Sequence, residues 1–387
     1  MSATRIGIVT KEWPPAVYGG AGVHVVQLTQ ALRKVSGIDV DVHCFGGHRT
    51  DGAFGYDTPS EFSSANPALQ AIATDLLIAN NLANVDVIHS HTWYANMAGH
   101  TASLLYGTPH IVSAHSLEPL RPWKAEQLGG GYQISSWAEK TSFEAAAAII
   151  AVSDGMRADV LAAYPDVDPK KVVTIRNGVD TSKFAPNNNP VVLQEFGITG
   201  RYAMFVGRIT RQKGLAHLLR AWKNVPAEYG LVLAAGSPDE ETVGNEVAAL
   251  IAELQATRSN VWWIKEMLPH DKLTAALTQA DLFLCPSIYE PLGIVNLEAM
   301  GCETAVLASR VGGIPEVVSH QETGILVDYT PDHPRFEADL TAAISELMAD
   351  PARLERYGKA GRVRAETHFG WDAVAQQTIA LYRSVIS

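Results

Sequence analysis

Short apolar runs alternate with longer amphipathic segments along the whole chain. Six such runs occur in the first half and six in the second, and each is short and almost continuously apolar, as expected of parallel strands covered on both faces by helices. Between the first two runs, Val25, Leu28, Leu32 and Val35 are spaced like one face of a helix. The predicted strands are residues 6–9, 40–45, 85–88, 110–114, 148–152, 172–175, 203–206, 231–235, 261–264, 282–285, 305–307 and 325–327.

The strand–helix alternation occurs twice, which predicts an α/β protein with two doubly wound parallel-sheet domains. A segment rich in proline and asparagine, residues 184–190, separates the two series, and a new strand begins near Tyr202. A surface loop within one domain is the alternative for this segment. We predict an N-terminal domain over residues 1–183, a linker over 184–200, a C-terminal domain over 201–368 and a helix within 369–387, where Trp371, Val374, Thr378, Leu381 and Val385 form an apolar stripe.

Charge and cysteine content narrow the functional classes. The 387 residues include 30 Lys and Arg against 41 Asp and Glu, a net charge of −11. Nucleic acid is therefore not an expected partner. The three cysteines are far apart and suit a reducing cytoplasm. No signal peptide is expected, because the N-terminal run of residues 5–10 is too short for its apolar region. No membrane span is expected either, because the longest uncharged stretch, residues 87–117, contains five histidines. We predict a cytoplasmic protein without a membrane partner.

A glycine-rich loop follows the first predicted strand and leads into a helix. Gly19, Gly20 and Gly22 would expose backbone N–H groups at the N-terminus of that helix, which favours a phosphate or a sugar. The spacing is not G-x-G-x-x-G, so the dinucleotide-binding fingerprint is absent. A tight turn that requires positive φ is the simpler alternative.

Two cations follow the first strand of the second domain. Arg208 and Lys213 lie in the segment 206–214, at a strand end where open α/β sheets bind ligands. Together they could hold a diphosphate and stabilise its charge as it leaves. A solvated basic turn is the alternative, but the presence of Arg211 beside them in an acidic protein favours a site.

Two glutamates, Glu290 and Glu298, flank the start of a predicted helix. The amides of Ile294 and Val295 would lie in its first turn, where backbone donors lack helical partners. Eight helical steps separate the carboxylates by about 12 Å, more than the ~5–9.5 Å of a glycosidase pair. The spacing therefore indicates two separate hydroxyl-binding roles.

Histidines gather after two strands of the first half. His89 and His91 share a strand face, so a metal site is considered. No cysteine accompanies them and no nearby carboxylate completes an obvious triad, so no metal is expected. His115, at the next strand end, is the best candidate for contact with substrate.

A basic and aromatic segment follows His115. Arg121 and Lys124 flank Trp123, and this arrangement could hold an anionic or carbohydrate acceptor, with the indole stacked on a sugar. A plain surface loop is the alternative for this segment.

In this order, the motifs resemble those of the GT-B glycosyltransferases of family four, which carry an E-x7-E signature. The likeness is closest to the ADP-glucose-dependent glycogen synthases and α-maltose-1-phosphate synthases of actinobacterial type, and it spans essentially the whole chain. The residues that carry it are Pro-Pro-x-x-Tyr-Gly-Gly-Ala-Gly-x-His-Val, His-Ser-His-Thr-Trp-Tyr, Ala-His-Ser-Leu-Glu-Pro-x-Arg-Pro-Trp-Lys, Arg-Asn-Gly-Val-Asp, Gly-Arg-x-x-x-Gln-Lys-Gly and Glu290 with Glu298.

The resemblance implies two Rossmann-like domains that face each other across a cleft, with the last helix crossing back to the N-terminal domain. It implies a retaining glucosyltransferase that uses ADP-glucose to form an α-1,4 bond in glycogen or α-glucan synthesis, without a metal or other cofactor. The acceptor is a glucan end or glucose 1-phosphate, the latter giving maltose 1-phosphate. UDP-glucose as donor and a homodimer as assembly remain open.

The resemblance also implies roles for individual residues. The catalytic set is Glu290, Arg208, Lys213 and His115. The donor diphosphate is held by Arg208 and Lys213 with the amides of Ile294 and Val295, the ribose by Glu298, the sugar hydroxyls by Glu290 and His115, and the donor–acceptor junction is lined by Gly19 and Gly20. Acceptor-binding residues are Arg121, Trp123 and Lys124. No protein nucleophile is evident, which favours attack from the face of the leaving group.

Two other classes are considered. A glycoside phosphorylase or hydrolase on a similar two-domain fold would cleave glucan without a nucleotide, but the cationic clamp and the carboxylate spacing argue against it. A non-catalytic sensor of nucleotide sugars would bind ADP without turnover.

Overall fold

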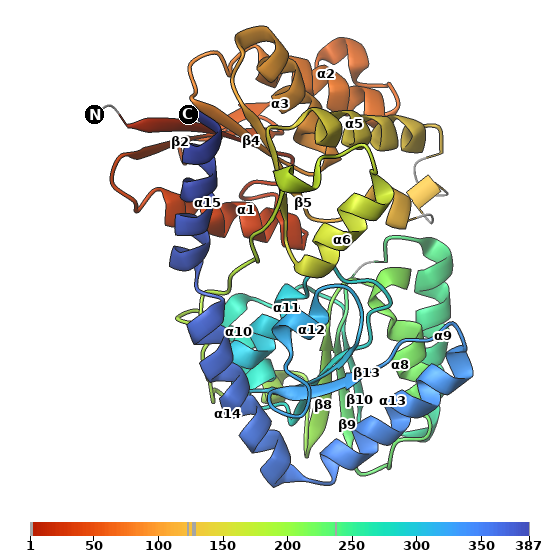
Figure 1. The fold of residues 1–387 in the computed structure, drawn as a ribbon. Coiled ribbons are helices and arrows are strands. Elements are labelled where there is room, and N and C mark those ends of the chain that lie inside the picture. The colour runs from red at the N-terminus through yellow and green to blue at the C-terminus, as the bar shows by residue number, and fades with distance from the viewer. Residues whose placement is uncertain (1–2, 122–123, 126–128, 237, 387) are drawn as a thin grey trace. The chain divides into compact units, whose positions relative to one another are not determined.

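The computed structural model describes residues 3–121, 124–125, 129–236 and 238–386, and the chain divides into two compact units (Figure 1). Unit 1 comprises Met1–Asn177 together with Trp371–Ser387, and unit 2 comprises Gly178–Gly370. Residues 184–200 are part of unit 2. They contain helix α7 (Val191–Glu195), and the side chain of Asn187 donates hydrogen bonds to Asp271 O and Thr274 Oγ1 on α10.

The sheet of unit 1 has seven strands in the order β3-β2-β1-β4-β5-β6-β7, and every pairing is parallel. The strands are β1 (Thr4–Thr10), β2 (Ile38–Phe45), β3 (Phe54–Tyr56), β4 (Val87–His91), β5 (His110–Ala114), β6 (Ala148–Ala151) and β7 (Val172–Thr174). The helices are α1 (Gly20–Leu32), α2 (Pro67–Ala79), α3 (Trp93–Tyr106), α5 (Gly131–Ala145), α6 (Asp154–Ala163) and α15 (Trp371–Ile386), with 3₁₀ turns at Ser60–Phe62, Glu118–Leu120 and Pro169–Lys171. The strand order reverses between β1 and β4, which is the topological switch point of a doubly wound sheet.

The sheet of unit 2 has six parallel strands in the order β10-β9-β8-β11-β12-β13. They are β8 (Tyr202–Val206), β9 (Gly230–Ala234), β10 (Val261–Ile264), β11 (Leu282–Cys285), β12 (Ala305–Ser309) and β13 (Gly324–Val327). Besides α7, the helices are α8 (Leu215–Trp222), α9 (Glu241–Thr257), α10 (His270–Thr278), α11 (Ile294–Gly301), α12 (Ile314–Val317), α13 (His333–Met348) and α14 (Pro351–His368). All twelve predicted strands, and the prediction of two doubly wound α/β sheets, are confirmed.

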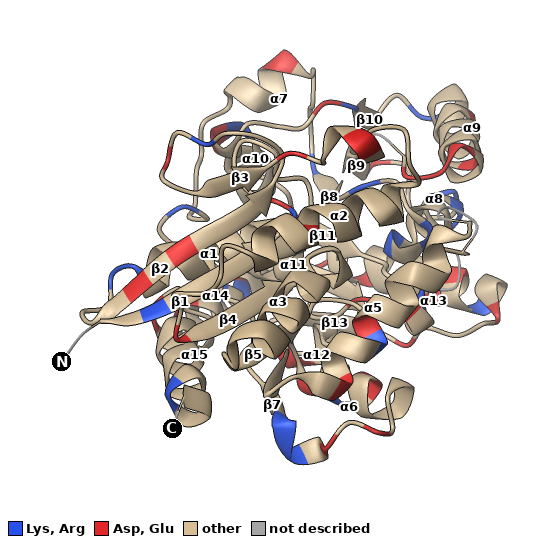
Figure 2. Cartoon of the chain, turned by 90° about the horizontal axis from the view of Figure 1, so that it is seen from above, with Lys and Arg blue, Asp and Glu red and all other residues tan. Residues whose placement is uncertain are grey.

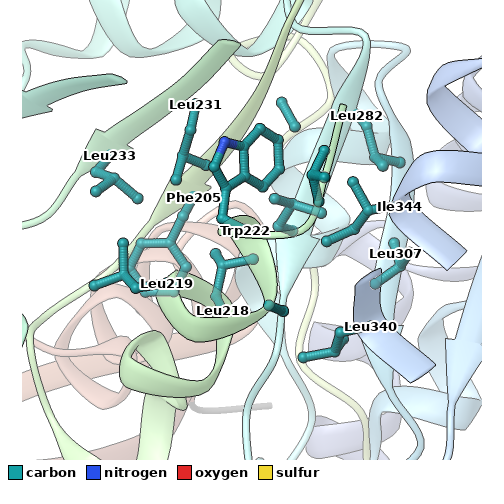
Figure 3. Close-up of a cluster of buried hydrophobic side chains, with 14 of the residues drawn as sticks. Phe205, Leu218, Leu219, Trp222, Leu231, Leu233, Leu282, Leu307, Leu340 and Ile344 are labelled. Atoms are coloured by element: carbon teal, nitrogen blue, oxygen red, sulfur yellow. The ribbon is translucent and has the colours of Figure 1, made fainter. Parts of the chain in front are cut away.

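Each unit has its own hydrophobic core. In unit 2 the indole of Trp222 lies among leucines from the strands and from α8, and Leu340 and Ile344 of α13 close the cluster (Figure 3). In unit 1 the predicted stripe of α1 packs on β1, and α15 packs against α1 (Figure 1). The apolar stripe predicted within residues 369–387 therefore completes the core of unit 1.

Charged residues of both signs are distributed along the chain. Figure 2 shows acidic and basic residues interspersed on helices and loops, and α3, which has no charged residue, is tan throughout. Among the described helices, none combines the length and the apolar character needed to cross a bilayer.

Candidate active site

At the carboxyl edge of the unit 2 sheet, a lysine and a glutamate from distant segments form an ion pair. Lys213 Nζ donates a hydrogen bond to Glu290 Oε2 at 2.6 Å, and Ser287 Oγ donates to the same oxygen at 3.3 Å. The side chains are only 20% and 10% exposed. Burial acts to lower the pKa of Lys213, but the Glu290 carboxylate outweighs it and the pKa lies above its ordinary value. The ammonium therefore stays charged at neutral pH.

Two glycines allow close backbone contacts around this pair, Gly214 between the loops that carry Lys213 and Glu290, and Gly312 between the loop after β12 and Glu290. Gly214 has φ of +64°, and a Cβ there would lie 2.0 Å from the carbonyl oxygen of Pro286. Gly312 has φ of +50°, and its Cβ would lie 2.0 Å from the carbonyl oxygen of Glu290. Only glycine combines this backbone conformation with so close an approach. The relative position of Lys213 and Glu290 is thus set by backbone packing.

The other two cations of the basic loop also have acidic partners. Arg208 Nη1 donates to both carboxylate oxygens of Asp239 at 2.7 Å, and Arg211 Nε donates to Glu240 at 3.2 Å. The sequence analysis did not identify these acids. They follow β9, which neighbours β8, so the strand order alone would have pointed to them. A single guanidinium nitrogen of Arg208, Nη1, makes both contacts with Asp239, and the role of Arg208 in binding a diphosphate remains a prediction.

Helix α11 begins at the predicted place. Its N-cap is Gly293, with φ of +96°, and Ile294 and Val295 occupy the first turn. Their amides belong to the group that has no helical acceptor, and the positive end of the helix dipole favours an anion there. Glu298 follows one turn later, and burial raises the pKa of its carboxyl to about 7. The roles of these three residues remain predictions.

In unit 1, strand ends and α1 bring three histidines together. His91 Nδ1 and His115 Nε2 are 3.0 Å apart, and the ring of His24 lies 4.8 Å from that of His115. Ring nitrogens of the three lie within 4.8 Å of one another, a grouping that could hold a metal ion. Burial lowers the pKa of His115 to about 4 and those of His24 and His91 well below their ordinary value. At neutral pH the cluster is uncharged, and the expectation of no metal remains a prediction.

His89 does not join this group through its nitrogens. Its Nδ1 pairs with the Tyr382 hydroxyl of α15 at 2.7 Å and its Nε2 with the Ser113 hydroxyl at 2.8 Å. The sequence analysis singled out His89 and missed His24. The i, i+2 spacing on one strand is visible in sequence, whereas the approach of α1 to the ends of β4 and β5 is tertiary.

The glycine loop after β1 wraps around a carboxylate that sequence reasoning also missed. Glu12 Oε2 accepts hydrogen bonds from the amides of Tyr18 at 2.9 Å and Gly19 at 2.8 Å. A Cβ at Gly22 would lie 2.5 Å from the same oxygen. Gly19 has φ of −128°, so a positive-φ turn does not explain this glycine. The glycines make room for Glu12, and donor contact by Gly19 and Gly20 remains a prediction.

The predicted acceptor residues lie in the segment after β5. The guanidinium of Arg121 forms an ion pair with the fully buried Glu118, whose other oxygen accepts a hydrogen bond from Ser135 at 2.7 Å. Lys124 N donates to Arg121 O at 2.9 Å. Trp123 lies outside the described residues. Arg121 is thus tied to the fold of unit 1.

Comparisons with known proteins identify the family of the chain. Residues 18–183 match the family described as Glycosyltransferase Family 4, and residues 194–364 match Glycosyl transferases group 1. The alpha-maltose-1-phosphate synthase of Mycolicibacterium smegmatis is 52% identical over 387 residues, covering 98% of this chain and 99% of that protein. A glycogen synthase of Mycobacterium tuberculosis is 27% identical over 98% of this chain and 94% of that protein.

Solved structures share the fold. A sucrose-phosphate synthase from Thermosynechococcus elongatus superposes with a TM-score of 0.81 at 24% identity, covering 99% of both chains. The Anabaena protein HepE in complex with UDP gives 0.78 at 19% identity, covering 98% of this chain and 100% of that one. Because the family regions match both halves of the chain and a relative matches its full length at 52% identity, the chain belongs to family four of the GT-B glycosyltransferases.

Proposed function

We propose that the protein is an α-maltose-1-phosphate synthase, which transfers glucose from ADP-glucose to glucose 1-phosphate with retention of configuration. The observation that carries this proposal is the 52% identity to a protein of that name over the full chain, against 27% for a glycogen synthase. The difference favours glucose 1-phosphate over a glucan end as acceptor. ADP-glucose as donor rests on the resemblance in sequence motifs.

The ion pair with Glu290 holds the Lys213 ammonium in place, where we propose that it stabilises the leaving diphosphate. As the glucosyl C1–O bond breaks, negative charge grows on the departing diphosphate. Lys213, Arg208 and the N-terminus of α11 offer fixed positive charge where it develops, at no cost of reorganisation. Because these groups can neutralise a diphosphate, the proposed mechanism includes no metal.

Retention is proposed to proceed by attack from the leaving-group face. Glu290 Oε2 already accepts hydrogen bonds from Lys213 and Ser287, which weakens that oxygen as a nucleophile. A phosphate oxygen of the leaving group then takes the proton of the acceptor hydroxyl. His115, uncharged at neutral pH, is suited to hydrogen-bond a donor-sugar hydroxyl. A glucosyl–Glu290 adduct detected by mass spectrometry would contradict this route.

The test is ADP release from ADP-glucose by the pure protein, with glucose 1-phosphate or glycogen as acceptor. We expect fast release and formation of maltose 1-phosphate with the former only. Fast release with glycogen alone would instead identify a glucan-elongating enzyme. Repeating the assay with UDP-glucose measures the donor preference, and dialysis against EDTA is expected to leave the rate unchanged.

Donor binding is predicted to weaken in acid because of Glu298. The pKa of its carboxyl, raised to about 7 by burial, means that the group gains a proton as the pH falls through 7. A protonated carboxyl accepts hydrogen bonds from the ribose hydroxyls less well, so the KM for donor should rise below pH 7. Glu298→Gln should raise the KM at every pH and remove this dependence, as measured by steady-state kinetics between pH 5.5 and 8.5.

The same shift predicts an effect on stability with a defined sign. Since the folded pKa lies above the ordinary value of 4.5, the folded state holds the proton more tightly, and the free energy of unfolding should fall as the pH rises from 4.5 to 7. Glu298→Gln should remove this loss of stability between pH 4.5 and 7. Glu253→Gln, at an exposed position of α9, is the matched control.

The two predictions for Glu298 are independent. A pH profile of the donor KM that is unchanged in Glu298→Gln would contradict the role of Glu298 in binding the donor.

A further inference from the structure

Three histidines of unit 1 bring ring nitrogens close together. His24, His91 and His115 each offer one ring nitrogen, and these three atoms lie within 4.8 Å of one another. His24 is only 2% exposed and His91 is fully buried, whereas His115 is partly exposed. The three nitrogens therefore form a compact set, which solvent can reach on the side of His115.

Several nitrogens of this set lack a hydrogen bond. Both ring nitrogens of His24 and Nε2 of His91 are buried and have no hydrogen-bond partner among the residues that the structure describes. Asn177 interacts with His24, but not with the geometry of a hydrogen bond to either ring nitrogen. A buried polar atom without a partner costs free energy. A ligand that the nitrogens can coordinate would reduce this cost.

The three imidazoles are also in the form that binds metals. Burial lowers the pKa of each ring, to about 4 for His115, so all three are neutral at pH 7. A neutral imidazole coordinates a metal through its lone pair and keeps its other N–H. His91 Nδ1 and His115 Nε2, 3.0 Å apart, share one hydrogen bond. Its proton would move to the other nitrogen of the same ring when both atoms coordinate an ion.

The topology of the sheet explains why these residues meet. His91 is the last residue of β4, and His115 follows β5, the next strand in the sheet. His24 lies in the second turn of α1, which follows β1 on the other side of β4. The sequence analysis expected no metal because it found no third ligand for His89 and His91. In the structure, His24 and His115 join His91 instead.

We propose that His24, His91 and His115 bind one Zn²⁺ or similar transition-metal ion, and that this ion inhibits glucosyl transfer. Three imidazoles with a fourth position open to solvent suit Zn²⁺ or Co²⁺ in tetrahedral geometry. Bonds of about 2.0–2.1 Å place the nitrogens of such a site about 3.4 Å apart. The pair of His91 and His115 is already near this spacing, and the ring of His24 has to move closer.

The inhibition rests on the proposed function, whereas the binding does not. An imidazole held by an ion cannot turn to hydrogen-bond a donor-sugar hydroxyl, which is the role proposed for His115. The ion is therefore not a cofactor of the reaction. The metal-free enzyme is the active form, in keeping with a proposed mechanism that includes no metal.

Calorimetric titration of the EDTA-treated, desalted protein with Zn²⁺ tests the binding without any substrate. We expect one ion per chain, and Co²⁺ should give the strong visible absorption of a tetrahedral site. His24→Phe keeps a ring against Trp371 but removes one ligand, so the affinity should fall about 100-fold or more. His48→Ala, at an exposed position of unit 1, is the control and should bind Zn²⁺ like the wild type.

Two results would overturn the site. One is that the wild type binds no Zn²⁺, and the other is that a His24→Phe variant with the Tm of the wild type binds it equally well. If His24→Phe does not fold, the Co²⁺ spectrum of the wild type decides, because weak absorption would show a six-coordinate ion outside the histidines.

Kinetics test the inhibition separately. Zn²⁺ should stop ADP release by the wild type over the concentration range in which it fills the site, and excess EDTA should restore the rate. Inhibition of His24→Phe should require about 100-fold more Zn²⁺, in line with its loss of affinity. A site that fills without loss of rate would overturn the inhibitory role. Failure of the proposed function is distinguishable, because the metal-free wild type would then form no maltose 1-phosphate.

Discussion

Replacing Lys213 with alanine is expected to lower kcat by about two to three orders of magnitude, the usual effect of removing one preorganised charge that stabilises a transition state. The KM for the donor should change only a few fold, because the diphosphate carries less charge at this position before the bond breaks. The 2.6 Å contact with Glu290 fixes the ammonium before substrate arrives. Steady-state kinetics with varied ADP-glucose separate the two parameters.

The control for this variant must account for the carboxylate that it leaves behind. The side chain of Glu290 is only 10% exposed, so Lys213→Ala leaves a buried charge without its partner and should also lower stability. The double variant Lys213→Ala/Glu290→Gln removes that charge and should recover the Tm without recovering kcat. Lys223→Ala, which breaks an exposed pair with Glu253, should leave kcat unchanged. An effect of Lys213→Ala confined to KM would refute the leaving-group role.

Gly214→Ala is expected to destabilise the protein by about 2–5 kcal/mol, from the left-handed backbone and from overpacking together. The added Cβ would meet the Pro286 carbonyl oxygen at 2.0 Å, and this carbonyl belongs to the loop that leads to Glu290. Relief of the clash moves Lys213 away from Glu290. The kcat should therefore fall tenfold or more, although Gly214 has no side chain to contact a ligand.

The control variant Gly200→Ala separates the strain of the left-handed backbone from the effect of the steric clash. Gly200 also has a positive φ, +74°, but nothing lies within 4 Å of a Cβ placed there. It should cost only about 1–2 kcal/mol, the strain of the left-handed conformation, and leave kcat unchanged. Chemical denaturation and kinetics of both variants give the comparison. Equal behaviour of the two alanine variants would show that contact between the loops does not set the geometry of the site.

The sequence predicts the strands well because their apolar runs are long enough to stand out. β3 was missed, since Phe54–Tyr56 is three residues at a sheet edge and carries no periodic signal. The helix within residues 369–387 was predicted from the spacing of Trp371 and its successors, and the structure places it in the core of unit 1. The local spacing of apolar residues thus identifies individual strands and helices, but it does not determine the order of the strands in the sheet.

Pairings across the sheet were the part that sequence could not supply. Lys213 and Glu290 were given separate roles, and their ion pair depends on β8 lying beside β11. The contacts of Arg208 with Asp239 and of His24 with His115 likewise join segments that only tertiary structure brings together. Candidate site residues could be predicted from sequence because catalysis requires particular side-chain chemistry. Their partners could not, because they depend on the topology of the sheet.

The placement of α15 has a consequence for the order in which the chain is made. Unit 2 is a continuous stretch, but unit 1 is interrupted by it and is completed by residues 371–386. During translation unit 2 emerges before Tyr382, the residue whose hydroxyl reaches His89. Domains that are continuous in sequence can fold as they leave the ribosome. Unit 2 can therefore finish folding before α15 is available to pack against α1 in unit 1. Unit 1 begins to emerge before unit 2 and is completed after it.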